Sequence, residues 1–511
     1  MKMSRYQSVT LIVISISTAM LFLDMTIFSV ALPAIQKSFN ATRAQTQWIV
    51  NIYLLVASVL AFAAGRISDM FGHQKVFSIG ILIFLLASLM CGISFNVVML
   101  IFFRAIQAFG AAFTLIAGMS LSASIFSDAD RGKANGIVMS VGSLAMVLSP
   151  FIGGIIVQWL NWHWIFFINV ILGIFIFYPT LKLLREKSER RVGETFDYIG
   201  FLIIGLFTIV TTLTFNNAGQ WGWSSLKSIS GFLISLMSFI LFIFIEKNKK
   251  HPVIRIQLFK IVNYVPGCAI MAMAQVTNYF IIFFGVFLQN ALGFSSFISG
   301  CLLLPAGILL AVFSSVGGYF SDKYGARMPM IAGLLLLTVG YSASTLFLKT
   351  LSYYAILPAL VGYGIGGCFL SNPLRTSILR NTPKEFFGMS SAILSGVRQV
   401  GGVIGFAITA GIIVHVERIK AQAQLLQLVP SLTTQKIHTL LGILSNTPSS
   451  QAIILQFSPS TQETIKNVIV KSYEYSLYCA LFFTSVLLLL CLLIALFFIK
   501  SENSSKNTAA R

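Results

Sequence analysis

The sequence contains one eight-residue pattern twice. Gly65–Gly72 reads GRISDMFG and Gly318–Gly325 reads GYFSDKYG, so both copies have the form G-x-x-x-D-x-x-G. Each copy lies in a short polar break between two long apolar segments, and Asp322 follows Asp69 by 253 residues (322 − 69). Internal repeats of membrane-spanning segments are typical of secondary transporters. The repeat therefore predicts two related halves built from membrane spans, and it makes solute transport the leading hypothesis.

Composition restricts the fold further. Hydrophobic residues make up 57% of the 511 residues and charged residues 10%, which leaves too little polar surface for a soluble globular body. We therefore expect an all-α polytopic membrane protein. A run of about 20 apolar residues can cross a hydrocarbon core of roughly 30 Å. We count fourteen such runs, at residues 9–32, 48–65, 76–94, 97–124, 134–157, 164–184, 199–215, 228–245, 264–288, 297–319, 328–348, 353–374, 388–416 and 475–499.

Lysine and arginine are distributed unevenly over the breaks between these runs. With the N-terminus inside, the inner breaks hold 24 of these residues and the outer breaks 9. The positive-inside rule then places both termini in the cytoplasm. The net charge of +20 is mostly an anchor for anionic lipid headgroups of the inner leaflet. A nucleic-acid partner would need a basic soluble domain, and none is visible in the sequence.

Motifs for metal binding and nucleotide hydrolysis are absent from the sequence. The six cysteines and five histidines form no C-x-x-C, H-x-x-x-H or H-E-x-x-H pattern, and there is no G-x-x-x-x-G-K-[ST] phosphate loop. We therefore expect no metal, no cofactor and no enzymatic activity. Without an ATP site, transport must use a gradient or run downhill.

The spacing of the repeat predicts how the spans are grouped. Eight apolar runs lie between the two copies, whereas two directly joined halves of six spans would leave six. The runs near 199–215 and 228–245 are therefore predicted to be inserted, which gives a 6+2+6 order. The predicted units are an N-terminal six-helix bundle, two inserted helices with charged linkers, a C-terminal six-helix bundle that includes an outer loop at 417–473, and a cytoplasmic tail. They cover residues 1–184, 185–263, 264–499 and 500–511.

The outer loop at 417–473 is the other irregular part of the chain. Pro430, Pro448 and Pro459 separate short amphipathic segments, which are too polar to cross a membrane. The loop is also short for a domain with much core of its own. We predict either a small external helical cap or a docking surface for another protein.

Further segments carry a resemblance to a known family. Leu23–Ile27 reads LDMTI, Val30–Pro33 reads VALP, Arg104–Gln107 reads RAIQ and Asn161–Asn169 reads NWHWIFFIN. Together with the two repeat copies, they resemble the major facilitator superfamily, specifically its fourteen-span drug:proton antiporters of EmrB/QacA type. The resemblance implies the major facilitator fold, a central cavity between two six-span bundles, alternating access and multidrug efflux. It also allows for a periplasmic adaptor protein.

The resemblance assigns roles to two further groups of residues. The repeat copies would be gating loops, with Gly65, Asp69, Gly72, Gly318, Asp322, Gly325 and Arg327. The fifth span resembles the antiporter packing motif at Gly136, Ala145, Ser149, Pro150 and Gly153. Alanine and serine replace two family glycines in that motif, but small side chains still permit close helix approach.

Asp24 is the only one of the fifteen acidic residues that falls deep within a predicted span. An ionised carboxylate in hydrocarbon costs several kcal/mol, so Asp24 must face a wet cavity, pair with a cation or hold a proton. Arg104 lies about seven residues in from the outer end of its span and Asp24 about eight, so at roughly 1.5 Å per residue they share a depth. We predict a proton-coupling pair. The alternative is a static ion pair that locks spans one and four together.

Other polar side chains within the spans are candidates for the substrate cavity. They are Arg398, Gln107, Gln275, Asn278 and Asn372, and the alternatives are structural hydrogen bonds or, for the arginine, snorkelling. One deep acid against Arg104 and Arg398 leaves about one positive charge. Neutral or weakly acidic lipophilic substrates are therefore favoured over dications.

The sequence as a whole favours a proton-coupled secondary exporter of amphiphilic drugs or toxic compounds. Its expected location is the bacterial inner (cytoplasmic) membrane, as a multi-pass protein, and its expected partners are small amphiphilic substrates, protons and the bilayer. A metabolite or siderophore permease on the same fold is one alternative. A non-transporting membrane scaffold or sensor is another.

Overall fold

The fold is known from a computed structural model, in which every described element is helical. The structure describes residues 4–126, 128–183, 197–247, 256–380, 382, 387–429, 432–445 and 447–500. The predicted cytoplasmic tail lies outside this range from residue 501 onward, as do Pro430 and large parts of the two charged linkers. The all-α fold class predicted from the sequence is confirmed.

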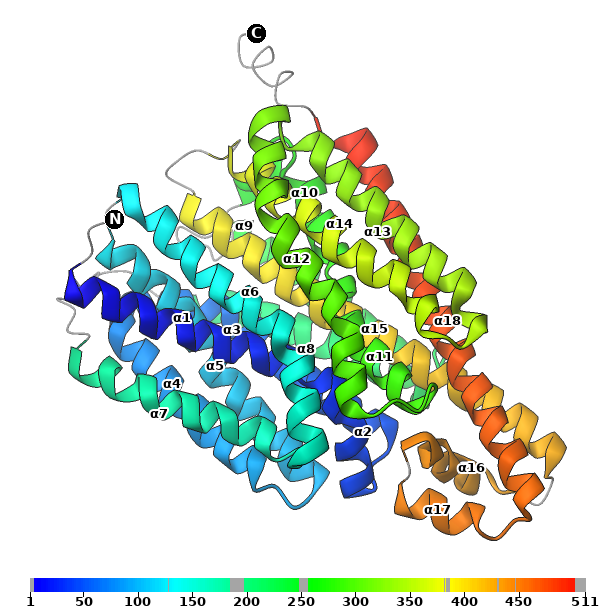
Figure 1. The fold of residues 1–511 in the computed structure, drawn as a ribbon. Coiled ribbons are helices and arrows are strands. Elements are labelled where there is room, and N and C mark those ends of the chain that lie inside the picture. Colours follow the sequence, from blue (N-terminus) through cyan, green and yellow to red (C-terminus); the bar gives the residue numbers. More distant parts are fainter. Residues whose placement is uncertain are drawn as a thin grey trace.

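The helices group along the chain as two bundles with a pair between them (Figure 1). The N-terminal bundle contains α1 (Arg5–Thr26), α2 (Phe28–Phe39), α3 (Arg43–Phe71), α4 (His73–Gly92), α5 (Val97–Ile125), α6 (Asp128–Trp159) and α7 (Trp164–Leu183). The inserted pair is α8 (Tyr198–Trp221) and α9 (Leu226–Lys247). The C-terminal bundle contains η1 (Ile256–Lys260), α10 (Tyr264–Ala274), α11 (Val276–Asn290), α12 (Ser296–Tyr324), α13 (Arg327–Phe347), η2 (Leu348–Thr350), α14 (Tyr353–Arg380), α15 (Phe387–Leu428), α16 (Thr434–Leu440), η4 (Leu441–Ser445), α17 (Pro448–Ile454) and α18 (Pro459–Phe498).

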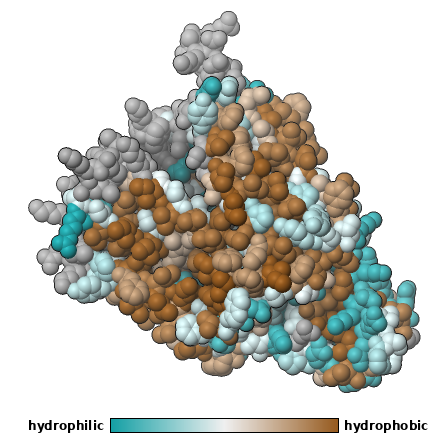
Figure 2. Space-filling model, in the orientation of Figure 1, coloured by the Kyte–Doolittle hydropathy of each residue, from teal (hydrophilic) through white to brown (hydrophobic). Residues whose placement is uncertain are grey.

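The protein is a multi-pass membrane protein. Within the described residues, thirteen helical segments are long and apolar enough to cross a membrane, and Trp164–Thr180 is a shorter apolar helix. Figure 2 shows hydrophobic residues over much of the bundle surface, as lipid contact requires, while hydrophilic residues gather at one end over α16 and α17. We call this the outer end, following the predicted orientation. The count of fourteen spans and the side of the termini stay predictions.

The first span of each bundle is interrupted near its middle. In the N-terminal bundle the break lies between α1 and α2 at Ile27, and in the C-terminal bundle it lies between α10 and α11 at Gln275. Pro33 has no N–H to donate to the Ser29 carbonyl one turn earlier. Gly285 of α11 packs against that carbonyl so closely that a Cβ would overlap its oxygen. Interrupted spans at corresponding positions of two repeats point to the transport site.

Close contacts between the two bundles lie toward the outer end. The Gly154 backbone of α6 packs on Ser296 at the start of α12, and Gly300 packs on Pro150, where added Cβ atoms would collide with backbone. Gln289 of α11 donates to the Val30 carbonyl of α2 at 3.0 Å. Because Gly154 and Gly300 have no side chain, the backbones of α6 and α12 approach each other directly, and the outer ends of the bundles are held together.

The two repeat copies have similar backbones. Each ends a helix of 29 residues, α3 or α12, at a glycine with positive φ, 92° at Gly72 and 80° at Gly325. A side chain at either position would be strained, which explains the final glycine of the pattern. Gly65 is partly buried, and Arg327 donates to the Leu496 carbonyl of α18 at 2.7 Å. Gly318 and the side chains of Asp69 and Asp322 are not described.

The outer loop differs from the sequence prediction. Helix α15 continues to Leu428 and α18 begins at Pro459, so much of the stretch 417–473 extends these two helices. Residues at helical spacing on the extensions pack against α16, η4 and α17 in a separate hydrophobic cluster. We call this unit the cap; its buried core is Ala421, Leu425, Leu432, Ile437, Leu440, Ile443, Ile454, Ile465 and Ile469. The cap is therefore a small helical unit, which is one of the two alternatives predicted from the sequence, and it has a small buried core of its own.

Candidate functional site

Asp24 lies at the centre of a buried polar cluster in the N-terminal bundle. Its Oδ2 atom accepts from Arg104 Nη1 at 2.6 Å, and its Oδ1 atom accepts from Gln107 Nε2 at 3.2 Å and from Asn169 Nδ2 at 2.9 Å. All four side chains are at most 1% exposed. The carboxylate is therefore held by one cation and two amides without direct access to solvent.

Helix geometry brings these groups together from distant parts of the chain. Arg104 and Gln107 are three residues apart on α5, so they lie on one face of that helix, and Nη1 of the arginine also donates to the glutamine Oε1 at 2.7 Å. Asn169 is on α7. Ser88 of α4 accepts from Gln107 at 2.9 Å and donates to the Phe166 carbonyl at 3.2 Å. Four spans thus meet at one acid.

Arg104 has a second set of partners besides the carboxylate. Its Nε donates to the Ile49 carbonyl of α3 at 3.3 Å. Its guanidinium carbon lies 4.4 Å from the ring centroid of Phe28 and 4.1 Å from that of Tyr53. Cation–π contacts stabilise a buried guanidinium. The arginine can therefore remain charged and satisfied while its bond to Asp24 changes.

The fifth-span motif packs α6 against the interrupted first span. Ser149 donates to the Leu23 carbonyl at 2.8 Å, next to the acid. A Cβ at Gly153 would lie 2.7 Å from the Ile27 side chain, whereas one at Gly136 would meet nothing within 4 Å. Ala145 is partly buried against the core. Serine in place of glycine thus adds a hydrogen bond at this contact.

Sequence reasoning grouped Gln107 with the substrate cavity, and the structure places it in the Asp24 cluster. Asn169 and Ser88 were missed as site residues. Asn169 falls in the quoted segment Asn161–Asn169, so that motif was the available signal, whereas no motif marked Ser88. The remaining candidates, from the C-terminal bundle and the gating loops, do not contact Asp24 in any described interaction.

The other four polar residues predicted to line the substrate cavity lie in the C-terminal bundle. Asn278 of α11 accepts from the Tyr363 hydroxyl of α14 at 2.7 Å. Gln275 is half-buried at the break before α11, beside Gly402 of α15. Asn372 of α14 and Arg398 of α15 are exposed. These candidates all belong to the C-terminal bundle, and none of them contacts the Asp24 cluster in a described interaction.

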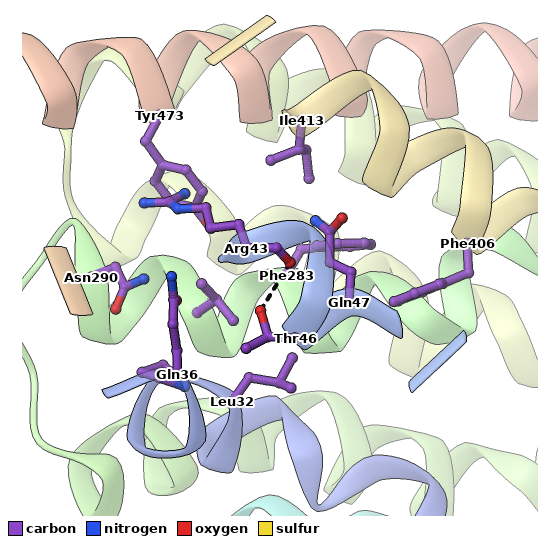
Figure 3. A pocket seen from close by; sticks show the side chains of 12 residues that line it. Leu32, Gln36, Arg43, Thr46, Gln47, Phe283, Asn290, Phe406, Ile413 and Tyr473 are labelled. Carbon is purple, nitrogen blue, oxygen red and sulfur yellow. Dashed lines mark hydrogen bonds between the residues drawn. The ribbon is translucent and has the colours of Figure 1, made fainter. Parts of the chain in front are cut away.

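A small pocket lies beneath the cap at the outer end (Figure 3). It encloses about 30 Å³ between α2, α3, α11, α15 and α18. Arg43 of α3 pairs with Glu417 of α15 at 2.8 Å, and its guanidinium lies 4.4 Å from the Tyr473 ring centroid. The sequence prediction placed Glu417 in a polar outer loop. The structure instead buries it to 1% exposure, because α15 continues and Arg43 offsets its charge.

Comparison with known proteins decides the family. Residues 14–406 match the family described as Major Facilitator Superfamily. The chain belongs to the Major Facilitator Superfamily. This match covers well over half of the sequence, and it confirms the family resemblance carried by the two repeat copies and by the segments around Asp24, Arg104 and Asn169.

Curated relatives of this superfamily member include transporters of several named substrates. The chain is 29% identical to the multidrug resistance protein Stp of Mycobacterium tuberculosis, covering 80% of this chain and 76% of that protein. It is 29% identical to the tetracenomycin C resistance and export protein of Streptomyces glaucescens, covering 78% and 74%. It is also 27% identical to the riboflavin transporter RibZ of Clostridioides difficile, covering 78% and 86%.

Solved structures support the fold. A bacterial homologue of the human lysosomal transporter Spinster, in an inward-facing conformation, superimposes with a TM-score of 0.65 at 16% identity, covering 97% of this chain and 98% of that chain. A D-xylose–proton symporter gives a TM-score of 0.60 at 14% identity, covering 87% and 99%. At these identities the likeness concerns the architecture alone.

Proposed function

We propose that this superfamily member is a proton-coupled secondary exporter of amphiphilic drugs or toxic compounds in the bacterial inner membrane. Relatives named as multidrug resistance and export proteins support the substrate class. The proposal assigns no enzymatic activity and no cofactor, and its energy source is the proton gradient. A periplasmic adaptor that docks on the cap is part of the same proposal.

The buried Asp24 cluster is the observation that carries proton coupling. An ionised Asp24 accepts from Arg104, Gln107 and Asn169, so it ties α1 to α5 and α7. A proton on the carboxyl group removes the charge that attracts Arg104 and turns one acceptor oxygen into a donor. The guanidinium keeps its carbonyl and aromatic partners on α2 and α3. Protonation thus loosens one set of helix contacts and leaves another intact.

This change acts at the interrupted first span. Asp24 lies one turn before the break at Ile27, and α2 beyond the break carries the contacts with the C-terminal bundle at Ser29 and Val30. A shift of α1 relative to α5 therefore reaches the interface between the bundles directly. Alternating access follows when the proton and the substrate favour opposite arrangements of that interface.

The test uses purified protein in liposomes with an imposed proton gradient and the neutral amphiphile N-phenyl-1-naphthylamine as substrate. Asp24→Asn should abolish uphill export while leaving binding and downhill exchange largely intact, because asparagine fixes a neutral group of similar shape. Glu463→Gln, which changes an exposed acid of the cap, is the matched control. Uphill export at the wild-type rate in the Asp24→Asn variant would refute proton coupling through this residue and favour a static ion pair.

A metabolite permease is the second candidate, because one relative is named a riboflavin transporter. Substrate range separates the two functions. An exporter of drugs should release protons on addition of many unrelated amphiphiles to the reconstituted protein. A permease should respond to one metabolite and its close analogues.

A further inference from the structure

Asn169 of α7 has a buried side-chain oxygen that accepts no hydrogen bond in the described part of the chain. The side chain is fully buried, and its Nδ2 atom donates to Asp24 Oδ1 at 2.9 Å and, over 3.4 Å, to Ser88 Oγ. An unpaired carbonyl group in a buried place is costly. The ionised Asp24 accounts for it, because two acceptor oxygens repel each other and only the nitrogen end of the amide can face a carboxylate.

A proton on Asp24 reverses this preference. The Oδ2 atom faces Arg104, and a guanidinium has no acceptor atom to receive a hydrogen bond from a new O–H group. The Oδ1 atom faces the side-chain amides of Gln107 and Asn169, and an amide can turn its oxygen toward a donor. A proton from the aqueous phase therefore adds to a lone pair of Oδ1, and one of the two amides rotates to accept from it.

The existing hydrogen bonds decide which amide rotates. Gln107 Oε1 accepts from the charged Arg104 at 2.7 Å. Its Nε2 atom donates to Ser88 at 2.9 Å and to Asp24 at 3.2 Å. Rotation of Gln107 would break all three bonds, including the charge-assisted one. Rotation of Asn169 loses only the long contact with Ser88, because the new bond from the acid replaces the old bond to it.

The rotation itself is inexpensive. The terminal torsion of an asparagine side chain is broad and roughly two-fold. Half a turn exchanges the oxygen and the nitrogen of Asn169, which are nearly equal in size, so the packing of α7 against α1 is kept. It also leaves the nitrogen unpaired in place of the oxygen. The two orientations therefore have similar costs, and the proton on Asp24 decides between them.

We propose that Asn169 accepts the hydrogen bond of protonated Asp24 through a half-turn of its side-chain amide. This inference rests on the proposed proton coupling and adds a residue to it. When the acid is ionised, Nδ2 of the amide donates to it; when the acid is protonated, Oδ1 of the amide accepts from it. Helix α7 thus stays bonded to α1 in both states, and the loosening on protonation falls on the ion pair with α5.

The charged and titratable groups near Asp24 come from three other helices. Arg104 of α5 is bonded to the acid at 2.6 Å. Tyr53 of α3 lies with its ring 4.1 Å from the guanidinium carbon, and Cys91 of α4 is buried within electrostatic range of both charges. Tyrosine and cysteine are ordinarily neutral at neutral pH. Among these groups, Asp24 is therefore the one whose charge changes when a proton is taken up.

Infrared difference spectra of the reconstituted protein, recorded between acidic and alkaline buffer, test the proposal. They contain the C=O band of each carboxyl group that gains a proton, and the band of Asp24 is the one lost in Asp24→Asn. Asn169→Leu has a similar volume and no polar group, so the Asp24 O–H group loses its acceptor and the band should move to higher wavenumber. Asn217→Leu replaces a half-buried asparagine of α8 that donates within its own helix, and it should leave the band in place.

Isotope-labelled asparagine provides a second measurement that needs no change at Asn169. A label on the side-chain carbonyl carbon separates the asparagine amide bands from those of glutamine and the backbone. In the wild type, one labelled band should change as Asp24 is protonated, because the Asn169 carbonyl passes from no hydrogen bond to one. This change should be absent in Asp24→Asn, so the comparison holds even if Asn169→Leu folds poorly.

Transport separates this role from a purely structural one. Asn169→Leu should lower uphill export of N-phenyl-1-naphthylamine about tenfold, as expected for the loss of one hydrogen bond in a buried site. Downhill exchange should change less than about twofold, because it does not require the proton. An equal loss in both assays would indicate that Asn169 only packs the bundle, and it would overturn the proposal.

The spectra distinguish failure of this inference from failure of the proposed function. An Asp24 band that keeps its position in Asn169→Leu would overturn the amide rotation and leave proton coupling through Asp24 intact. A labelled asparagine band that does not change in the wild type would do the same. If no Asp24 carboxyl band forms at any pH, proton uptake by this acid is refuted, and the inference about Asn169 is refuted with it.

Discussion

The ion pair between Arg43 and Glu417 predicts how the outer end opens. Arg43 belongs to the N-terminal bundle, whereas Glu417 and Tyr473 belong to the C-terminal bundle. The pair and the cation–π contact therefore exist only while the bundles are closed at this end. Nearby, Ser445 of η4 donates to Gln36 of α2 at 2.8 Å. Glu417→Gln keeps the shape of the side chain and removes its charge, so it should weaken the closed state.

The burial of the pair sets the size of the effect. Its side chains are 10% and 1% exposed and its N–O distance is 2.8 Å. Removing one partner of such a pair costs about 3–5 kcal/mol when the other charge stays buried. Opening of the outer end returns Arg43 to water, so part of this cost is relieved by opening. We take about 2 kcal/mol as the shift, which is about 30-fold in the equilibrium. An outward-open population of about 1% would rise to about 20–25%.

Distances between two spin labels across the outer end measure this population. Labels attached through Phe95→Cys in the N-terminal bundle and Leu455→Cys on the cap occupy exposed positions, in a background without the native cysteines. We expect a second, longer distance in Glu417→Gln that is absent or minor in the wild type. Glu463→Gln serves as the control, because it removes an exposed acid of the cap.

A charge swap provides the refuting experiment. Arg43→Glu combined with Glu417→Arg should return the distance distribution toward that of the wild type, although each single variant shifts it. If the Arg43–Glu417 pair does not hold the outer end closed, Glu417→Gln will give the same distance distribution as Glu463→Gln. The interpretation is also wrong if the double variant increases the open population by as much as the two single variants together.

The repeat loops, the helix packing and the cap lead to three further predictions. Asp69→Ala should change the transport rate more than the substrate Kd, because the repeat loop is expected to gate; a lost affinity at an unchanged rate would contradict this. Gly285→Ala should lower the Tm, since overpacking of backbone against Ser29 costs about 1–3 kcal/mol, whereas Gly136→Ala, which meets open space, should leave the Tm unchanged. Deleting Ser431–Ser460 removes the cap contacts with α2 and the surface proposed to dock an adaptor, so it should reduce resistance in cells more than transport in vesicles; an equal loss in both assays would rule out a purely adaptor-docking role.

The sequence alone was enough to predict the features that a local motif, an apolar run or a single charged residue determines. The long apolar runs predict membrane-spanning helices, because a helix satisfies its own backbone hydrogen bonds within the bilayer. The two glycine-aspartate repeats predict that these helices form two related halves. A single acid in the first span also predicts a buried cationic partner, since an unpaired charge there is too costly. Counting residues along each span was enough to place Asp24 and Arg104 at the same depth.

Only the tertiary structure decided how side chains on different helices meet. Asn169 and Ser88 join the Asp24 cluster from α7 and α4, and their contacts depend on how each helix is rotated about its axis. The sequence prediction placed Glu417 in a loop, whereas the structure places it within α15. Arg375 lies one residue beyond the predicted twelfth span, whereas the structure continues α14 to Arg380. Hydropathy locates the apolar stretch of a helix, but helices extend beyond it when neighbouring elements cover them. The partners of a polar side chain are therefore set by packing, which no local pattern in the sequence records.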